Sequence, residues 1–169
     1  RLVIETRKDQ VEKLNWSFRM MEDGKEPDER CKQLEKFFRC PDQEHDWPQW
    51  LRMLLEDMFV IDAATIYPRR TRGGELYALE LIDGATVKRL IDDTGRTPIP
   101  PDPAYQQILK GVPAADYTLE ELLYRPRNVR TNKVYGYSPV EQIIVTINMA
   151  LNRQASQLSY YTDGSTPDL

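Results

Sequence analysis

The sequence predicts an α+β fold, in which helices pack on a mainly antiparallel region of β-hairpins and a long helix follows. Three observations predict this class. Apolar residues recur at helical spacing in residues 1–62, short strand-like runs alternate with turns in residues 63–135, and a long helical pattern covers residues 138–161. We therefore treat the 169 residues as one domain fragment with these three regions.

The composition is typical of a folded domain with a well-solvated surface. Apolar residues make up 40% of the chain, which is enough to bury a core, and charged residues make up 30%. The net charge of −4 argues against a surface that attracts polyanions as a whole, so any contact with nucleic acid must be local. The sequence has no run of about 18 apolar residues and no secretion leader, so we expect no contact with a membrane.

Two features concern the origin of the chain and its compartment. The chain starts at Arg1 without a methionine, and we expect it to be a piece of a longer protein. Cys31 and Cys40 lack the Cys-x-x-Cys spacing of redox and zinc motifs. We therefore expect reduced thiols in a cytoplasmic setting rather than a disulfide or a zinc site.

Residues 1–62 are expected to be mainly helical with one strand. Residues 2–14 have apolar residues at helical spacing, whereas Trp16, Phe18 and Met20 alternate with polar residues and predict a half-buried strand. A second helix is expected to begin around residues 27–29, where a proline and two acidic residues favour a first turn. The clearest helix follows Asp46, a suitable N-cap, and carries Trp47, Trp50, Leu51, Leu54, Leu55, Met58 and Ile61 at helical spacing.

Residues 63–135 are expected to be mainly β. Residues 65–67 and 76–82 flank an arginine-rich and glycine-rich turn, so they predict a β-hairpin with a basic tip. Four prolines in residues 98–103 predict an extended loop. Further short strands are expected at residues 87–91, 105–109 and 122–124.

The last helix has the strongest start signal in the chain. Ser138, Pro139 and Glu141 form a capping box, in which the serine caps free amides and the glutamate can reach back to the Ser138 amide. Gly164 and Pro167 are expected to end the helix. Its apolar stripe comprises Ile143, Ile144, Ile147, Leu151, Ala155 and Leu158. Because the helix is long for so small a domain, we expect part of its face to pack on another chain.

Titratable residues give little support for catalysis. His45 is the sole histidine, and in its polar connector we favour a solvated loop role over a metal-binding or acid–base role. The acidic residues Asp62, Glu80, Asp83, Asp92 and Asp93 match a carboxylate-metal nuclease by residue type alone. Aspartate in turns usually bonds the backbone, and for Asp62 we favour the acceptance of backbone amides. We expect no catalytic residue, no metal and no cofactor.

Two basic clusters are candidates for a macromolecular contact. One is the hairpin tip with Arg69, Arg70 and Arg72, and the other is a loop with Arg125, Arg127, Arg130 and Lys133. These side chains could meet DNA phosphates without reading sequence, or pair with an acidic face of a neighbouring subunit. In a chain of net charge −4 we favour the subunit contact over DNA, with plain solvation as the next alternative.

A series of motifs runs through residues 46–169. Its most specific parts are a Tyr-Gly-x-Ser-Pro-x-Glu signature at residues 135–141 and a later Gly-x-x-Pro at residues 164–167. Supporting segments lie at residues 50–64, 74–87, 103–111 and 122–128. The order of these motifs resembles that of the portal proteins of tailed bacteriophages and prophages. The matching segment is similar to the outer body, or wing, of a portal subunit.

The resemblance implies a structural protein of the virion. Portal proteins form a ring, usually of twelve subunits, at one capsid vertex, and double-stranded DNA passes through the channel during packaging and ejection. The implied partners are copies of the chain, terminase, scaffold and capsid proteins, head–tail adaptor proteins and non-specifically bound DNA. The implied location is the virion, and the host cytoplasm during assembly.

Several questions stay open at the level of the sequence. Ring contacts under load need large interfaces, on the order of 2,000 Å² each, and a truncated subunit can lose them. Both a ring and a monomer are therefore expected alternatives for this chain by itself. Another virion connector or adaptor, a DNA-binding domain and a metal-dependent DNA-processing domain are the alternative functions.

Overall fold

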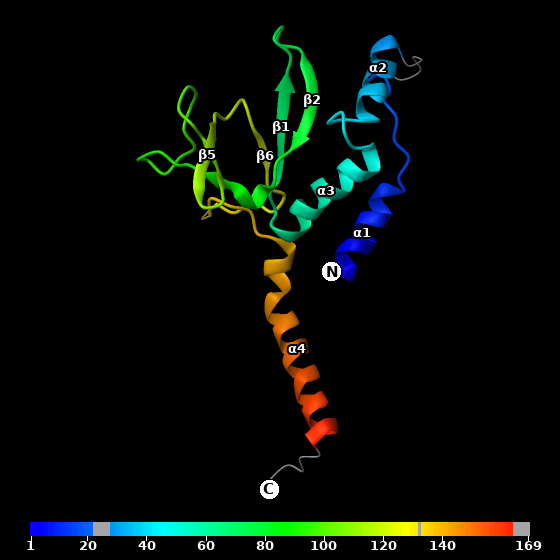
Figure 1. Ribbon diagram of the computed structural model, residues 1–169, viewed down its shortest axis with the longest axis vertical. Coiled ribbons are helices and arrows are strands. Elements are labelled where there is room, and N and C mark those ends of the chain that lie inside the picture. The colour runs from blue at the N-terminus through cyan, green and yellow to red at the C-terminus, as the bar shows by residue number, and fades with distance from the viewer. Residues whose placement is uncertain (22–27, 132, 164–169) are drawn as a thin grey trace.

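A single helix projects from a head that is built of three helices and two small sheets (Figure 1). The computed structural model describes residues 1–21, 28–131 and 133–163. The helices are α1 (Leu2–Glu12), α2 (Glu29–Phe38), α3 (Trp47–Val60) and the projecting α4 (Pro139–Asp163), with a 3₁₀ turn, η1 (Gly84–Thr86). The fold class is α+β, as the sequence predicts.

The strands form two antiparallel sheets of three strands each within the described residues, in the orders β2-β1-β6 and β3-β4-β5. Their bounds are β1 (Ala64–Arg70), β2 (Leu76–Leu81), β3 (Val87–Arg89), β4 (Tyr105–Leu109), β5 (Val112–Tyr117) and β6 (Leu123–Arg125). The hairpin β1–β2 and the strands β3, β4 and β6 confirm predictions. Strand β5, which carries Pro113 and pairs only with β4, was not predicted from the sequence.

Helix starts follow local signals that the sequence makes visible. The Asp28 carboxylate accepts a hydrogen bond from the Cys31 amide at 3.0 Å, and the Asp46 carboxylate accepts one from the Gln49 amide at 3.0 Å. Each bond satisfies an amide that the first helical turn leaves free. The predicted stop signals of the last helix, Gly164 and Pro167, lie outside the described residues.

The prediction of a strand at residues 16–20 is wrong. This segment belongs to no helix or strand, and no strand pairs with it in the described part of the chain. Its alternation has another cause, because Trp16 and Phe18 pack on Phe38 with ring centroids 6.4 Å and 5.5 Å away. Trp47 extends the cluster, 5.1 Å from Trp16. The alternating pattern therefore places aromatic rings on α2 and α3 instead of on a sheet face.

The outer edge of the β1–β2 hairpin is closed by the N-terminal third of the chain. The Leu79 amide donates to the Pro41 carbonyl at 2.8 Å, and the Leu79 carbonyl accepts from Trp50 Nε1 at 2.8 Å. Gln43 Nε2 also donates to the Tyr77 carbonyl at 3.4 Å. Because open strand edges invite pairing with other chains, these bonds protect this edge.

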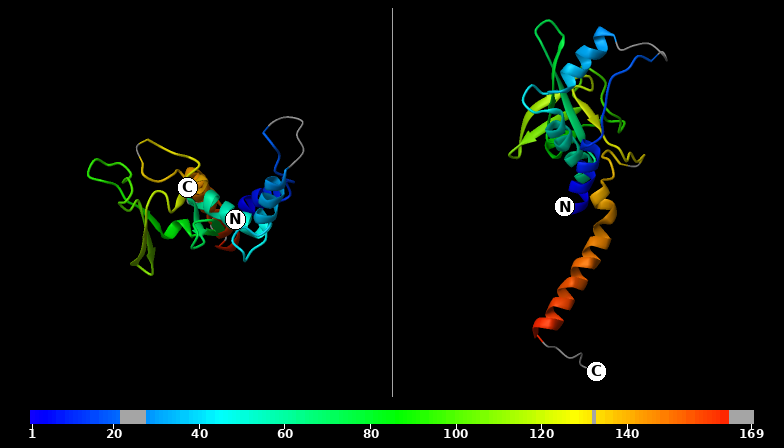
Figure 2. Two further views of the ribbon diagram at one scale, coloured as in Figure 1. Left: turned by 90° about the horizontal axis from the view of Figure 1, so that it is seen from above. Right: turned by 90° about the vertical axis from the view of Figure 1, so that its right-hand side faces the viewer.

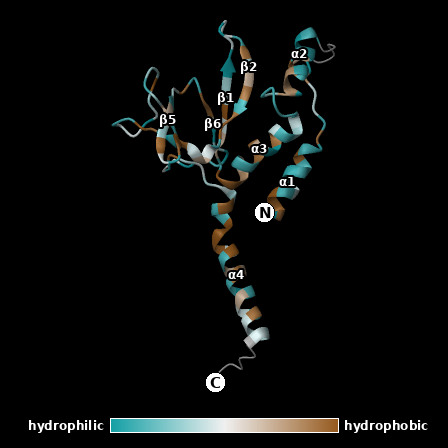
Figure 3. Cartoon of the chain, viewed as in Figure 1, coloured by the Kyte–Doolittle hydropathy of each residue, from teal (hydrophilic) through white to brown (hydrophobic). Residues whose placement is uncertain are grey.

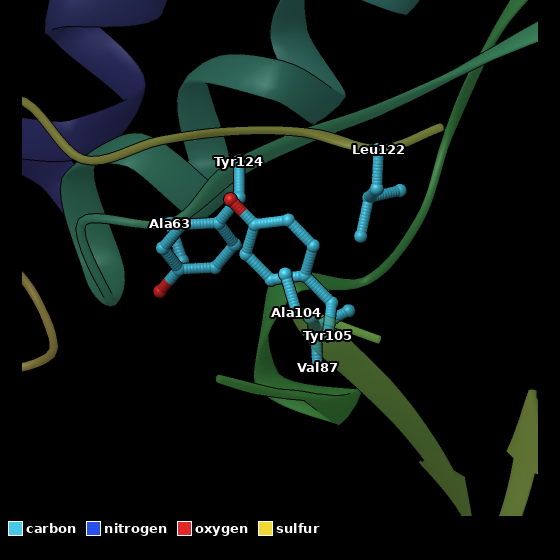
Figure 4. Packing of buried hydrophobic residues seen from close by; sticks show 6 residues of the cluster. All are labelled: Ala63, Val87, Ala104, Tyr105, Leu122 and Tyr124. Atoms are coloured by element: carbon cyan, nitrogen blue, oxygen red, sulfur yellow. The ribbon is translucent and has the colours of Figure 1, made fainter. Parts of the chain in front are cut away.

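A small core joins the two sheets. Its buried members are Ala63, Val87, Ala104, Tyr105, Leu122 and Tyr124 (Figure 4). The rings of Tyr105 and Tyr124 stack with centroids 5.7 Å apart, and burial raises the pKa of the Tyr124 phenol to about 12. Because Ala63 belongs to this cluster, the start of the β region is held from both sheets.

Ion pairs fasten α1 to α3, a feature that was not predicted from the sequence. The Arg52 guanidinium lies 2.7 Å from Glu5, 2.6 Å from Asp9 and 2.7 Å from Glu12. Lys8 is buried and pairs with Glu5 at 3.2 Å and with Glu56. The two helices therefore meet through charge rather than through an apolar stripe.

Candidate assembly surface

The junction between the head and α4 is organised by Asp62, the residue that follows the C-cap of α3. Its side chain is fully buried at 0% exposure, and its backbone is left-handed with φ 56°. Oδ1 accepts the Arg127 amide at 2.9 Å and Oδ2 accepts the Asn128 amide at 2.8 Å. The predicted role of Asp62, acceptance of backbone amides, is confirmed. The two bonds fix Arg127 and Asn128, at the start of the segment that leads into α4.

Gly136 shows why the signature at residues 135–141 needs a glycine. A β-carbon at this position would stand 2.1 Å from Asp62 Oδ2 and 2.9 Å from the Pro126 side chain. No side chain fits at such distances, so only glycine lets the loop lie against the buried carboxylate. The signature therefore has a glycine at position 136 because the loop packs closely against Asp62 there.

The start of α4 has half of the predicted capping box. The Ser138 hydroxyl accepts the Glu141 amide at 2.9 Å, and Pro139 is the first helical residue. The predicted reciprocal bond, from the Ser138 amide to the Glu141 carboxylate, is not formed between these two described residues. The carboxylate lies 4.0 Å from the Arg130 guanidinium, which stacks 4.0 Å above the Tyr137 ring.

Arg89 on β3 fastens the other side of the same loop. Its amide donates to the Tyr135 hydroxyl at 3.2 Å, and its guanidinium donates to the Val134 carbonyl and, at 3.3 Å, to Thr97 Oγ1. The guanidinium also stacks 5.6 Å from the Tyr124 ring centroid. The end of α3, through Asp62, and strand β3, through Arg89, thus both hold the segment before α4.

Beyond its first turn, α4 has no support from the head. Every side chain that the structure describes from residue 141 to residue 162 is exposed. Two perpendicular views show the helix extending away from the head (Figures 1 and 2), and hydrophobic residues alternate with hydrophilic ones along it (Figure 3). Its exposed apolar side chains are Ile143, Ile144, Val145, Ile147, Met149, Leu151, Leu158, Tyr160 and Tyr161.

Apolar exposure on this scale is unusual for a helix that works alone. A helix in water gains most of its stability from packing, and large exposed apolar patches mark sites of contact with other molecules. The long helix is confirmed. The expectation that part of its face packs on another chain stays a prediction. Within the described residues, no helix has the length and apolar content needed to span a membrane.

The two predicted basic clusters lie far apart. Arg125 pairs with Ala64 at one end of β1, and the hairpin tip is at the other end, about 20 Å away at the rise of a strand. At the tip, Arg69 pairs with Glu80 at 2.8 Å and Arg70 donates to the Gly74 carbonyl at 2.9 Å. Arg72 is exposed, as are Arg125, Arg127 and Lys133 in the loop. The structure therefore offers two separate basic surfaces, and Arg130 connects the second one to α4.

The acidic residues proposed for a nuclease are scattered and bonded locally. Asp83 caps η1 by accepting the Ala85 amide at 2.9 Å, and Asp92 accepts the Thr94 and Arg96 amides at 2.8 Å and 2.9 Å. Glu80 pairs with Arg69, Asp93 is exposed, and Asp62 holds the loop. Among the described residues, no group of three or more acidic, histidine or cysteine side chains could hold a metal ion.

His45 pairs with a neighbouring acid instead of facing water alone. Its Nδ1 lies 2.7 Å from Asp42 Oδ2, and its side chain is 35% exposed. The hydrogen bond to Asp42 raises the pKa of the imidazole. Asp42 also accepts the Glu44 amide at 3.0 Å and the His45 amide at 2.7 Å, so the pair shapes the connector between α2 and α3.

Comparison with known proteins gives a fold match without a sequence match. No family model matches the sequence, and no curated protein matches it. Solved structures of gene transfer agent (GTA) particles contain chains of similar fold. A chain of the neck of an empty GTA particle, computed with C6 symmetry, has a TM-score of 0.73 and 10% identity over 97% of this chain and 42% of that chain.

Two further matches come from native GTA particles. A chain of the virion of the native particle has a TM-score of 0.65, with 12% identity over 80% of this chain and 37% of that chain. A chain of the neck computed with C12 symmetry has a TM-score of 0.63, with the same identity and coverage, 12%, 80% and 37%. This chain spans less than half the length of each of these chains. At such low identity the likeness concerns the fold.

Proposed function

We propose that this chain is part of a structural subunit at the head–tail connection of a phage-like particle, and that it works by assembling into a ring. One observation carries the proposal. The fold is shared over 97% of the chain with a component of a particle neck computed with rotational symmetry. The uncovered helix α4 supports the same proposal, because a ring subunit needs surfaces shaped for its neighbours.

Within this class we assign the chain to a portal subunit. The support is the series of motifs that resembles portal proteins, above all residues 135–141. Gly136 and Ser138 of that signature fix the loop and the helix start, so the resemblance concerns residues that shape the fold. A portal subunit would form the channel for packaging and ejection at the capsid vertex, in a ring of about twelve copies. Its partners would be terminase, scaffold, capsid and adaptor proteins and, without sequence preference, double-stranded DNA.

The proposed role is not catalytic. The acids that a metal-dependent nuclease would need bond backbone amides or arginine, as described for Asp62, Asp83 and Asp92. Incubation with DNA and magnesium tests this aspect of the proposal, and we expect no cleavage. Cleavage that Asp83→Ala or Asp92→Ala abolishes would overturn the structural role.

Assembly provides the central test. We expect the full-length protein that contains this chain to form closed rings by electron microscopy, with one predominant subunit number by native mass spectrometry. A full-length protein that stays monomeric over the whole accessible concentration range would contradict the proposal. The neighbouring genes test the finer assignment: a portal gene is expected beside genes for a terminase large subunit and for a capsid protease or scaffold.

A further inference from the structure

Helix α4 carries two apolar stripes instead of one. At about 100° of rotation for each helical residue, one sector of the surface contains most of the aliphatic side chains. We call this sector the broad stripe, and its members are Ile143, Ile144, Ile147, Leu151 and Leu158, which are 38–64% exposed. A second set, the narrow stripe, consists of Val145, Met149 and Tyr160, which are 68%, 61% and 58% exposed.

The two stripes lie on opposite sides of the helix. Their centres are about 180° apart at the helical repeat, with Asn148 between them on one side and Gln157 on the other. Charged side chains are scarce here, since residues 139–162 contain only Glu141 and Arg153, whereas 30% of the whole chain is charged. A helix that stayed in water on one side would normally place its charges there. Arg153 lies at the edge of the narrow stripe, about 20° from Tyr160, and Ser156 lies in the same sector between Val145 and Met149. With one charged residue beside the narrow stripe and none in the broad stripe, both sides of α4 are suited to being covered.

Opposite stripes match the geometry of a large ring. Seen from one copy in a ring of n copies, its two neighbours lie 180° − 360°/n apart, about 60° for three copies and about 150° for twelve. A two-fold dimer would use a single self-complementary patch, and a trimer would place both patches on one side. The separation of about 180° on α4 thus fits many copies around one axis.

We propose that α4 is packed between two other copies of this chain, with the broad stripe of each copy against the narrow stripe of the next. The proposal rests on the ring assembly of the proposed function and names the surface that builds it. Rotation about a ring axis keeps every copy of α4 at the same level along that axis, so residues that face each other across a contact must lie at similar positions along the helix. The stripes satisfy this condition. Val145 and Met149 alternate in the sequence with Ile144 and Ile147, and Tyr160 lies two residues from Leu158.

Charge substitutions on each stripe test this arrangement. Ile147→Glu interrupts the broad stripe and Met149→Glu interrupts the narrow stripe, while Asn148→Glu adds the same charge between them. All three positions are exposed and distant from the head, so the fold is kept, which circular dichroism checks. Buried against a neighbour, an unpaired carboxylate should raise the concentration for half-assembly by about a hundredfold or more. Asn148→Glu should change it less than about threefold.

The decisive experiment mixes Ile147→Glu with Met149→Glu. Either variant alone lacks one of the two surfaces that every contact needs, so each should be monomeric in native mass spectrometry and sedimentation velocity. Mixed together, the intact broad stripe of Met149→Glu can pair with the intact narrow stripe of Ile147→Glu. The expected product is a one-to-one heterodimer that cannot grow further.

The outcomes separate this inference from the proposed function. Wild-type rings together with normal rings of both single variants would overturn the two-stripe contact and leave ring assembly in place. Homodimers of Met149→Glu alone would also overturn it, because they would mean that broad stripes pair with each other. Only a wild-type protein that stays monomeric would remove both proposals together.

Discussion

Gly136 lies directly against the buried carboxylate of Asp62, so close that a β-carbon at position 136 would stand 2.1 Å from Asp62 Oδ2. The contact joins two places that are 74 positions apart in the numbering, the end of α3 and the loop before α4. Because the same carboxylate accepts the Arg127 and Asn128 amides, the loop cannot move away without losing both bonds. The direction in which α4 leaves the head therefore depends on this contact.

Substitution of the glycine should be costly. We expect Gly136→Ala to reduce the free energy of unfolding by about 3 kcal/mol, at the upper end of the range for overpacking, because a methyl group would displace the carboxylate from two amides. Urea unfolding measures this loss. Gly73→Ala is the matched control, since its added methyl would meet nothing closer than Thr71 Oγ1 at 3.7 Å. Equal stability of both variants would refute the close contact.

The hydrogen bonds of Asp62 can be tested without a change of size. Asp62→Asn keeps one oxygen but turns an NH₂ group toward a backbone amide that needs an acceptor. Asparagine tolerates the left-handed φ of 56°, so the backbone conformation is not the cause of any effect. We expect a loss of about 2 kcal/mol, the contribution of hydrogen bonds to a charged group. Asp93→Asn, in an exposed turn, should stay within about 0.5 kcal/mol of the wild type.

The cap of α4 makes a smaller contribution. Ser138→Ala removes the hydroxyl that accepts the Glu141 amide and should destabilise the last helix by about 1 kcal/mol. Thermal unfolding followed by the helical signal measures the change. Gln157→Ala provides the control in the exposed middle of the same helix, between the two stripes, where alanine is the better helix former. A melting curve of Ser138→Ala that matches the wild type would count against the observed helix start.

The His45–Asp42 pair predicts a stability that depends on pH. The hydrogen bond to Asp42 raises the pKa of His45 above 6.5, so its contribution is complete below that value and is lost as the pH rises through the folded pKa. For Asp42, burial favours the neutral acid, but hydrogen bonds from the His45 and Glu44 amides outweigh it and lower the pKa. That contribution is lost as the pH falls below about 3.8. Between these limits the pair stabilises the connector.

The measurement compares melting temperatures at two pH values. His45→Gln should lower the melting temperature more at about pH 5.5 than at about pH 8.5, because only the lower pH charges the imidazole. Asp42→Asn combined with His45→Gln should show no further pH dependence from this pair. An equal effect of His45→Gln at both pH values would mean that the ion pair contributes nothing.

Features with local causes were predictable from the sequence, whereas features with distant causes were not. The caps at Asp46 and Ser138 depend on residues within one helical turn, and the hairpin depends on its own turn, so neighbouring residues are sufficient evidence. Asp28 was expected only as an acid of the first turn, and its role as the N-cap was not predicted. The bonds of Arg52 to α1 cross 40 to 47 positions, and nothing in either segment indicates the other. The strand β5 was missed because Pro113 and a pair of alanines conceal its alternation.

For the candidate surface, the helix was predictable from the sequence, but only one of its stripes was. Ile143 to Leu158 form a conventional amphipathic pattern, which is why the broad stripe was visible. The narrow stripe was not visible, because in the sequence its members look like isolated apolar residues on the polar side of the helix: Val145, Met149 and Tyr160. Only the structure shows that all three are exposed on a helix that the head does not support, which indicates a second contact surface. The role of Asp62 as an acceptor of backbone amides was predicted, whereas its contact with Gly136 required the fold.

Variants of the two basic clusters can distinguish contacts with a neighbouring subunit from contacts with DNA. Because Arg69 already pairs with Glu80, the hairpin tip is better tested through Arg70→Gln with Arg72→Gln. Arg127→Gln with Lys133→Gln tests the loop, and Arg7→Gln with Lys13→Gln on and beside α1 is a control with the same change of charge. We expect one or both test pairs to raise the half-assembly concentration by about tenfold, as loss of complementary charge across an interface does.

DNA binding provides the opposing readout for the same variants. If the basic side chains face a neighbouring subunit, the affinity for duplex DNA, measured by fluorescence anisotropy, should change no more in the two test variants than in the α1 control variant. If they face phosphates, affinity should fall steeply with salt in the wild type, and the slope should become shallower by about one for each contact removed. Unchanged assembly together with a shallower slope would reassign these residues to the DNA channel, because a phosphate contact releases counterions and a buried subunit contact does not.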